Sequence, residues 1–142
     1  MRSIVIVALQ LSLIVAIVLP LDAGGWNLPA TALVGAGIGL GAWALTANRP
    51  GNFNIRPDVK PGGRHVTQGP YAYVRHPMYL AVMLGMLGFS LGYGTPWRWA
   101  ALVALGAVLA IKMAIEEAQM TARHPGYAAY ARSTKRIVPF IW

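Results

Sequence analysis

The sequence contains no cysteine, and only four of its 142 residues are acidic. The absence of cysteine excludes disulfide-stabilised folds, cysteine-based zinc sites and iron–sulfur clusters. Charged residues make up 11% of the chain, against about 25% in soluble domains, and too few polar residues remain to cover a soluble domain. Hydrophobic residues make up 56%, which excludes a disordered chain. At this length we expect one domain, residues 1–142, and the composition indicates a small integral membrane protein.

Four stretches of the chain are apolar and nearly free of charge. The first has 17 residues, close to the minimum that crosses a bilayer at 1.5 Å per residue. It could alternatively be a secretory signal peptide, but residues 21–23 form a poor cleavage site. The sequence therefore predicts an all-α membrane protein with about four transmembrane helices, two of them within residues 1–47. The four stretches are residues 3–19, 30–47, 77–93 and 97–116.

The net charge of +8 has a topological pattern. Ten of the 12 lysine and arginine residues lie at the N-terminus, between the second and third stretches, or after the fourth. The exceptions are Arg98, at the start of the fourth stretch, and Lys112 within it. By the positive-inside rule we expect both termini and the polar segment 48–68 in the cytoplasm. A segment of this length is either a linker or a lid over a site. The alternative, a nucleic-acid surface, has no accompanying motif, so we expect membrane lipids and no nucleic acid as partners.

Alternating glycines in the second stretch favour close helix packing. Gly35 and Gly39 form one GxxxG pair, and Gly37 and Gly41 form another. A nucleotide-binding loop would need GxGxxG between a strand and a helix, and the sequence shows neither that spacing nor that context.

The segment GPYAYVRHPMY, residues 69–79, opens the third stretch. Pro77 suits the first turn of a helix and biases His76 towards an extended backbone. Arg75 and His76 are therefore expected at a helix N-terminus, whose free N–H groups and positive dipole end attract anions. Alternatively, Arg75 anchors to lipid phosphate and His76 caps the helix.

Three ionisable residues, Lys112, Glu116 and Glu117, lie at the end of the fourth stretch. Such groups are costly in a bilayer unless they face a cavity or one another. Lys112 and Glu116 are four residues apart and share a helix face. Because the third stretch begins on the side where the fourth ends, we expect Arg75 and His76 to converge with these three residues. A structural salt bridge is the alternative.

The tail extends this pattern. Tyr127 and Tyr130 are three residues apart, and basic residues and a proline follow them, which predicts a cytoplasmic amphipathic helix at the membrane surface.

Taken together, these motifs resemble the superfamily of isoprenylcysteine carboxyl methyltransferases and phospholipid methyltransferases. The signature of that superfamily is approximately GPYxxxRHPxY, then EExxL, then YxxY with basic residues and a proline. The resemblance covers residues 66–141, so we expect a methyltransferase-like core over residues 66–142, preceded by two generic spans. Met120 replaces the leucine of EExxL, a nearly isosteric change.

The resemblance implies S-adenosylmethionine as the methyl donor and a lipophilic acceptor, which can be an isoprenylcysteine-type carboxylate, a lipid amine or a thiol. Lys112 is at a position that faces the acceptor and is arginine in the carboxyl methyltransferases. The lost guanidinium fork weakens the case for carboxylate recognition. Arg136 is a second expected substrate contact. The expected cofactor contacts are His65, Val66, Tyr71, His76, Pro77, Met78, Tyr79 and Glu116.

The expected catalytic residues are Arg75, His76 and Glu117. His76 and Arg75 would hold the cofactor carboxylate at the helix N-terminus, and Glu116 or Glu117 would pair with a cation. His76 or Glu117 would act as base if the acceptor is an ammonium group. No metal is expected. Three other classes remain as alternatives: a small four-span transporter, a nicotinamide-dependent reductase of related architecture, and a structural membrane subunit.

Overall fold

The computed structural model describes residues 2–21, 23–48 and 66–139, so His65 and most of the segment 48–68 lie outside the described residues. Within these ranges the chain forms five α-helices and one 3-10 helix, and no strand. The all-α class is therefore confirmed. The elements are α1 (Arg2–Val18), α2 (Leu28–Asn48), η1 (Gly69–Ala72), α3 (Pro77–Tyr93), α4 (Pro96–Arg123) and α5 (Tyr127–Ser133).

The helix bounds follow the apolar stretches closely, except at the end of the fourth. There α4 continues to Arg123, so Glu116 and Glu117 lie about two turns before its end. The added residues are mostly good helix formers, and the helix stops at His124, immediately before Pro125.

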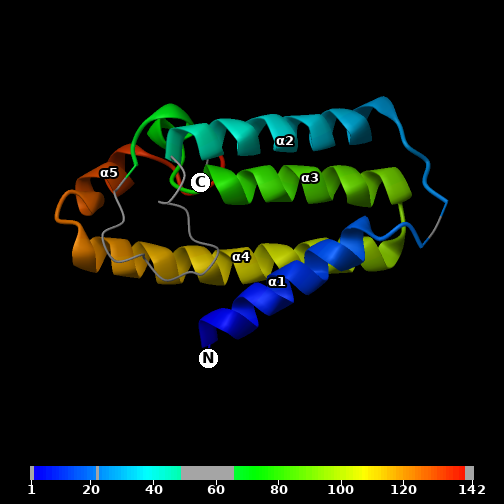
Figure 1. Cartoon of the computed structure of the whole chain (residues 1–142), viewed down its shortest axis with the longest axis horizontal. Helices are drawn as coiled ribbons and strands as arrows, with labels where there is room; N and C mark the ends of the chain where they lie inside the picture. Colours follow the sequence, from blue (N-terminus) through cyan, green and yellow to red (C-terminus); the bar gives the residue numbers. More distant parts are fainter. Residues whose placement is uncertain (1, 22, 49–65, 140–142) are drawn as a thin grey trace.

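The helices lie side by side in an elongated bundle (Figure 1). In that view α3 lies between α2 and α4, while α1 crosses α4 obliquely. The apolar core contains Ile17 from α1 and Leu102, Leu105 and Leu109 from α4, and side chains of α3 pack against it. The connections between α1 and α2 and between α3 and α4 lie at one end of the bundle. The η1 and α5 segments lie at the other end.

Glycine permits the close approach of α2 and α3. A Cβ atom on Gly37 would lie 2.7 Å from the carbonyl oxygen of Ala81, and one on Gly88 would lie 2.7 Å from that of Ala30. The predicted packing role of the Gly37 pair is therefore confirmed. The same prediction is wrong for the pair of Gly35 and Gly39, because a Cβ atom on either would meet nothing within 4 Å in the described chain.

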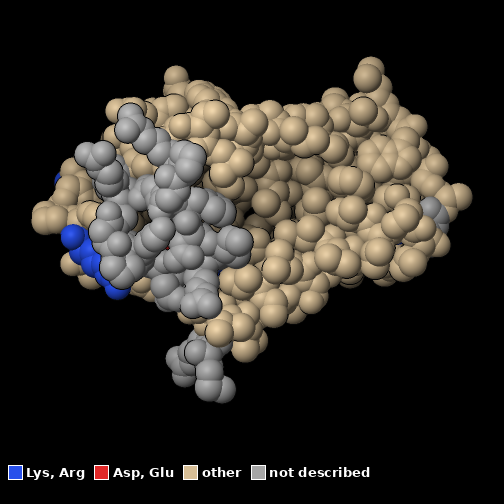
Figure 2. Space-filling model, viewed as in Figure 1, with Lys and Arg blue, Asp and Glu red and all other residues tan. Residues whose placement is uncertain are grey.

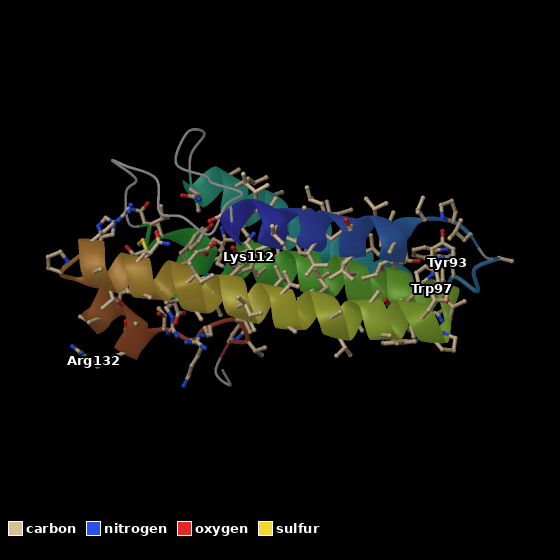
Figure 3. The ribbon with its side chains drawn as sticks, turned by 90° about the horizontal axis from the view of Figure 1, so that it is seen from below. Tyr93, Trp97, Lys112 and Arg132 are labelled. Carbon is tan, nitrogen blue, oxygen red and sulfur yellow. The ribbon has the colours of Figure 1, made fainter. Side chains whose placement is uncertain are left out.

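A buried arginine joins the helices at the end opposite η1. Arg98 is completely buried and donates to the carbonyl oxygens of Ile17 (3.1 Å) and Leu19 (2.7 Å). Its guanidinium carbon lies 3.8 Å from the centre of the Tyr93 ring. Arg98 thus satisfies the carbonyl groups at the C-terminal end of α1, where a cation also complements the helix dipole. Figure 3 shows Tyr93 and Trp97 at this end.

The surface is consistent with a lipid environment. Val5 is 65% exposed, Ile38 69% and Val103 74%, each on a different helix. On the face in Figure 2, the described surface carries Lys and Arg atoms only at the end where α4 meets α5. By length and composition, α2 and α4 can cross a membrane, whereas α1 and α3 are shorter apolar helices.

Candidate functional site

The site forms where α3 begins. Pro77 is the first residue of α3, as predicted, and the preceding His76 has φ −125° and ψ 58°. His76 occupies the N-cap position of α3, but its side chain makes no capping hydrogen bond. The imidazole points instead to the two glutamates of α4.

The tail after α5 pairs with the backbone that leads into α3. The N–H of Arg75 donates to the carbonyl of Lys135 (2.8 Å), and the N–H of His76 donates to that of Arg136 (3.1 Å). Pro77 has no N–H group. The tail therefore already binds the backbone N–H groups of the two residues that precede α3.

Glu117 is bound by three basic side chains. Its Oε1 accepts from Arg75 Nε at 2.8 Å and lies 3.0 Å from His76 Nε2, while its Oε2 accepts from Arg136 Nη2 at 2.7 Å. The Glu117 side chain is 14% exposed. Its two oxygens are thus largely occupied, and the carboxylate joins α4 to the tail and to the residues just before α3.

Arg75 also donates to the tail backbone. Its Nη1 lies 2.8 Å from the carbonyl oxygen of Ala131 and 2.6 Å from that of Thr134. With 12% of its side chain exposed, Arg75 joins α4 to α5 rather than reaching outward to a lipid phosphate.

Glu116 has a different environment from Glu117. Its Oε1 accepts a hydrogen bond from the Tyr79 hydroxyl, and its Oε2 lies 3.6 Å from His76 Nδ1. The rings of His76 and Tyr79 stack, with centroids 5.5 Å apart and planes within 14°. The Glu116 side chain is 22% exposed, so it is the more accessible of the two carboxylates and is held in a defined orientation.

Lys112 lies deeper in the bundle, on the side of α1. It is 1% exposed, donates from Nζ to Gln10 Oε1 at 2.6 Å, and lies 5.2 Å from the centre of the Tyr79 ring. Figure 3 shows Lys112 between α1 and α4, far from Arg132 at the α5 end. Gln10 was not among the residues expected at the site, although it is the single amide in the first apolar stretch, which is the signal that points to it.

Tyrosines connect η1 to α5. The Tyr130 hydroxyl donates to the carbonyl oxygen of Tyr71 at 2.6 Å. Burial, with a smaller contribution from the nearby Glu116 carboxylate, raises the pKa of Tyr71 to about 12. Burial also raises the pKa of Tyr130 to about 12, so both hydroxyls stay protonated well above neutral pH.

The remaining expected cofactor contacts differ in burial. Pro77 is buried, whereas Val66 and Met78 are half-buried. The convergence expected from the sequence thus brings Arg75, His76, Glu116 and Glu117 together, with Arg136 and Tyr79, while Lys112 extends the cluster towards α1.

Comparison with known proteins decides the family. Residues 26–126 match the phospholipid methyltransferase family. The chain belongs to this family. The match includes Tyr71, His76 and both glutamates, whereas Gln10 and Arg136 lie outside it. The resemblance to the wider superfamily of membrane methyltransferases is therefore confirmed.

One curated relative is the cobalt-zinc-cadmium resistance protein CzcN of Cupriavidus metallidurans. It is 37% identical to this chain over 82 residues, which cover 52% of this chain and 35% of the relative. The chain therefore spans about a third of the length of that relative. No solved structure matches the chain.

Proposed function

We propose that this chain transfers a methyl group from S-adenosylmethionine to a lipophilic acceptor, at the end of the bundle where α3 begins. The acceptor would be an isoprenylcysteine-type carboxylate or a lipid amine. One observation supports the site above all others. Two adjacent glutamates have separate environments, with Glu117 bound by three basic side chains and Glu116 oriented by Tyr79 and partly open.

The residues present fit the cofactor. When bound, S-adenosylmethionine supplies an electrophilic methyl group on a cationic sulfur, and it also carries an ammonium and a carboxylate. Glu116 would hold a cationic group, since its carboxylate is partly open and fixed by Tyr79. Arg136, whose side chain is 33% exposed, would bind the carboxylate. Tyr71 and Tyr79 supply aromatic surfaces for the adenine.

The residues of the site contribute positioning more than proton transfer. Glu117 orients Arg75 and Arg136 across the α4–α5 junction, and His76 faces a carboxylate at each ring nitrogen. We therefore assign His76 and Glu117 to holding Glu116 and the tail in place. Methyl transfer between held groups gains most of its rate from orientation and exclusion of water.

We also propose that α1, α2, α3 and α4 all cross the membrane, as one domain, with both termini and the site on the cytoplasmic side. The 17-residue helices α1 and α3 are at the lower limit of spanning length, about 17–25 residues. They pack alongside α4 and α2, which are long enough to cross. Basic residues gather at the end where α4 meets α5, which supports this orientation (Figure 2).

Calorimetric titration of the detergent-solubilised protein with S-adenosylhomocysteine tests the cofactor. We expect Glu116→Gln and His76→Ala to weaken binding at least about tenfold, or about 1.4 kcal/mol, because the first removes the charge that would contact the cofactor and the second removes a side chain that positions Glu116. Arg132→Gln, an exposed charge on α5, is the matched control and should bind as the unmutated protein does. Transfer of labelled methyl groups into a membrane lipid extract would then identify the acceptor.

The alternatives give different results in the same assay. The name of the curated relative concerns resistance to cobalt, zinc and cadmium. Within the described residues, no group of three or more His, Cys, Asp or Glu side chains could hold a metal ion. Binding of Zn²⁺, Co²⁺, Cd²⁺, NADPH or a cationic drug in place of S-adenosylhomocysteine would overturn the methyltransferase proposal.

A further inference from the structure

A buried polar pair links α1 to the site. Gln10 is 9% exposed and Lys112 is 1% exposed, and the Lys112 ammonium donates to Gln10 Oε1 at 2.6 Å. The same ammonium lies 5.2 Å from the centre of the Tyr79 ring, whose hydroxyl donates to Glu116. Gln10 thus lies one side chain away from the residues proposed to bind the cofactor, although it is outside the part of the chain that matches the family.

The chemistry of this contact fixes the orientation of the Gln10 amide. An ammonium group has only donors, so the amide oxygen must face Lys112. The amide nitrogen of Gln10, which carries two N–H donors, is on the same planar amide group as this oxygen. A lone lysine lacks the two-donor fork of arginine, but Lys112 and Gln10 together offer a cationic donor and a neutral donor next to each other.

Gln10 is neutral, and this determines the charge of the pair. It accepts a hydrogen bond from Lys112 without adding a negative charge, whereas a glutamate of nearly the same shape would add one.

The groups first expected to act as bases also face other partners. Glu117 accepts from Arg75 and Arg136, and both nitrogens of His76 face carboxylates. The site therefore suits an acceptor that arrives already deprotonated.

We propose that Gln10 is a specificity-determining residue on the acceptor side, which together with Lys112 receives the carboxylate of an anionic lipophilic acceptor. This role rests on the proposed function. In the transfer, a carboxylate oxygen forms a C–O bond to the methyl carbon as the C–S bond breaks, and the bonding electron pair stays on sulfur. No proton is released, so the step requires no base.

The test uses two fluorescent amphiphiles that share a twelve-carbon chain and a terminal fluorophore, one with a carboxylate head and the other with an amine head. Their binding to the full chain in detergent, with S-adenosylhomocysteine present, is followed by fluorescence anisotropy. We expect the unmutated protein to bind the carboxylate probe at least about tenfold more tightly than the amine probe. Gln10→Glu should reduce this ratio to about threefold or less, because it neutralises the Lys112 charge.

Two further variants separate recognition from packing. Gln10→Leu removes the amide and should weaken the carboxylate probe about tenfold while leaving the amine probe unchanged. Ser12→Leu, an exposed polar position on the same helix, is the matched control and should keep the original ratio. The affinity for S-adenosylhomocysteine should stay within about twofold in all three variants.

The remaining outcomes count against the proposal. An unmutated protein that shows no carboxylate preference, including one that binds neither probe, overturns it. So does a Gln10→Glu variant that keeps the preference, or one that loses both probes and S-adenosylhomocysteine together, since that pattern indicates a packing role. Failure of the unmutated protein to bind S-adenosylhomocysteine overturns the proposed function separately, and the probe ratio then decides only whether Gln10 takes part in carboxylate binding.

Discussion

Glu116 and Glu117 are consecutive residues, yet the helix directs their side chains about 100° apart. Glu117 faces the tail and meets Arg75 and Arg136, whereas Glu116 faces α3 and meets Tyr79. One carboxylate is thereby used for structure, and its neighbour remains available for a ligand. This division explains the two adjacent glutamates, because a single carboxylate could not bind the basic cluster and also remain partly open beside Tyr79.

The first prediction concerns the residue with the most ionic partners. Glu117→Gln removes the negative charge between Arg75, His76 and Arg136, leaving these basic groups near one another in a largely buried place. Removing one partner of a buried ion pair costs about 3–5 kcal/mol, and partial exposure of Arg136 reduces this to about 2–3 kcal/mol. We expect the melting temperature in detergent to fall by at least about 5 °C.

The control for this variant is Arg132→Gln, which removes an exposed charge from α5 and should leave the melting temperature unchanged. Differential scanning fluorimetry measures both. An equal melting temperature for Glu117→Gln and the unmutated protein would show that the ion cluster does not hold the tail.

The residues of the site differ in how well the sequence predicts them. Spacing identifies Arg75, His76, Glu116 and Glu117, because each belongs to a motif at the end of an apolar helix. Gln10 belongs to no motif, and its contact with Lys112 crosses 102 positions of sequence. The pairing of the Arg75 and His76 backbone with the tail was also missed, since hydrogen bonds between backbones leave no pattern in side-chain types.

At the scale of elements, α2 and α3 pack closely because glycines remove side chains from the interface. Sequence spacing alone offered two GxxxG pairs on α2 and could not say which one faces α3. The structure selects Gly37, where a Cβ atom would lie 2.7 Å from a backbone oxygen, over Gly39, where it would meet nothing. A GxxxG pair thus indicates that close packing is possible, and the neighbouring helix determines which pair is used.

The second prediction follows from these two glycines. Gly37→Ala places a methyl group against the backbone of α3, and overpacking of this kind costs about 1–3 kcal/mol. We expect its melting temperature in detergent to fall by several degrees. Gly39→Ala adds the same methyl group to the same helix in open space and should match or slightly exceed the unmutated protein. If both variants melt alike, α2 does not pack on α3 through Gly37.

At the scale of the whole molecule, the apolar stretches located all four long helices, because the length of a hydrophobic run in a membrane protein indicates the length of the helix that it forms. They did not show how far α4 extends, since its last turns are polar yet helical. The apolar stretches also did not show which helix packs against which. The oblique contact of α1 with α4, which brings Gln10 to Lys112, depends on shapes that composition does not encode.

The last prediction concerns topology. The chain has no native cysteine, so single cysteines report their own position when an impermeant maleimide is added to intact cells. Ala129, exposed on α5, and Ser3, near the start of α1, should react only after the membrane is opened. Gly25, exposed between α1 and α2, should react in intact cells. Each variant should first be shown to bind S-adenosylhomocysteine, so that only folded protein is compared.

The three positions separate the possible arrangements. If α1 crosses the membrane, Ser3 and Gly25 must react from opposite sides, because a single spanning helix separates them. If α1 instead lies along one surface, both react from the same side, and the four-span proposal fails although α2 and α4 still cross. If Ala129 reacts in intact cells and Gly25 does not, the spans are retained but the orientation inferred from the basic residues is reversed.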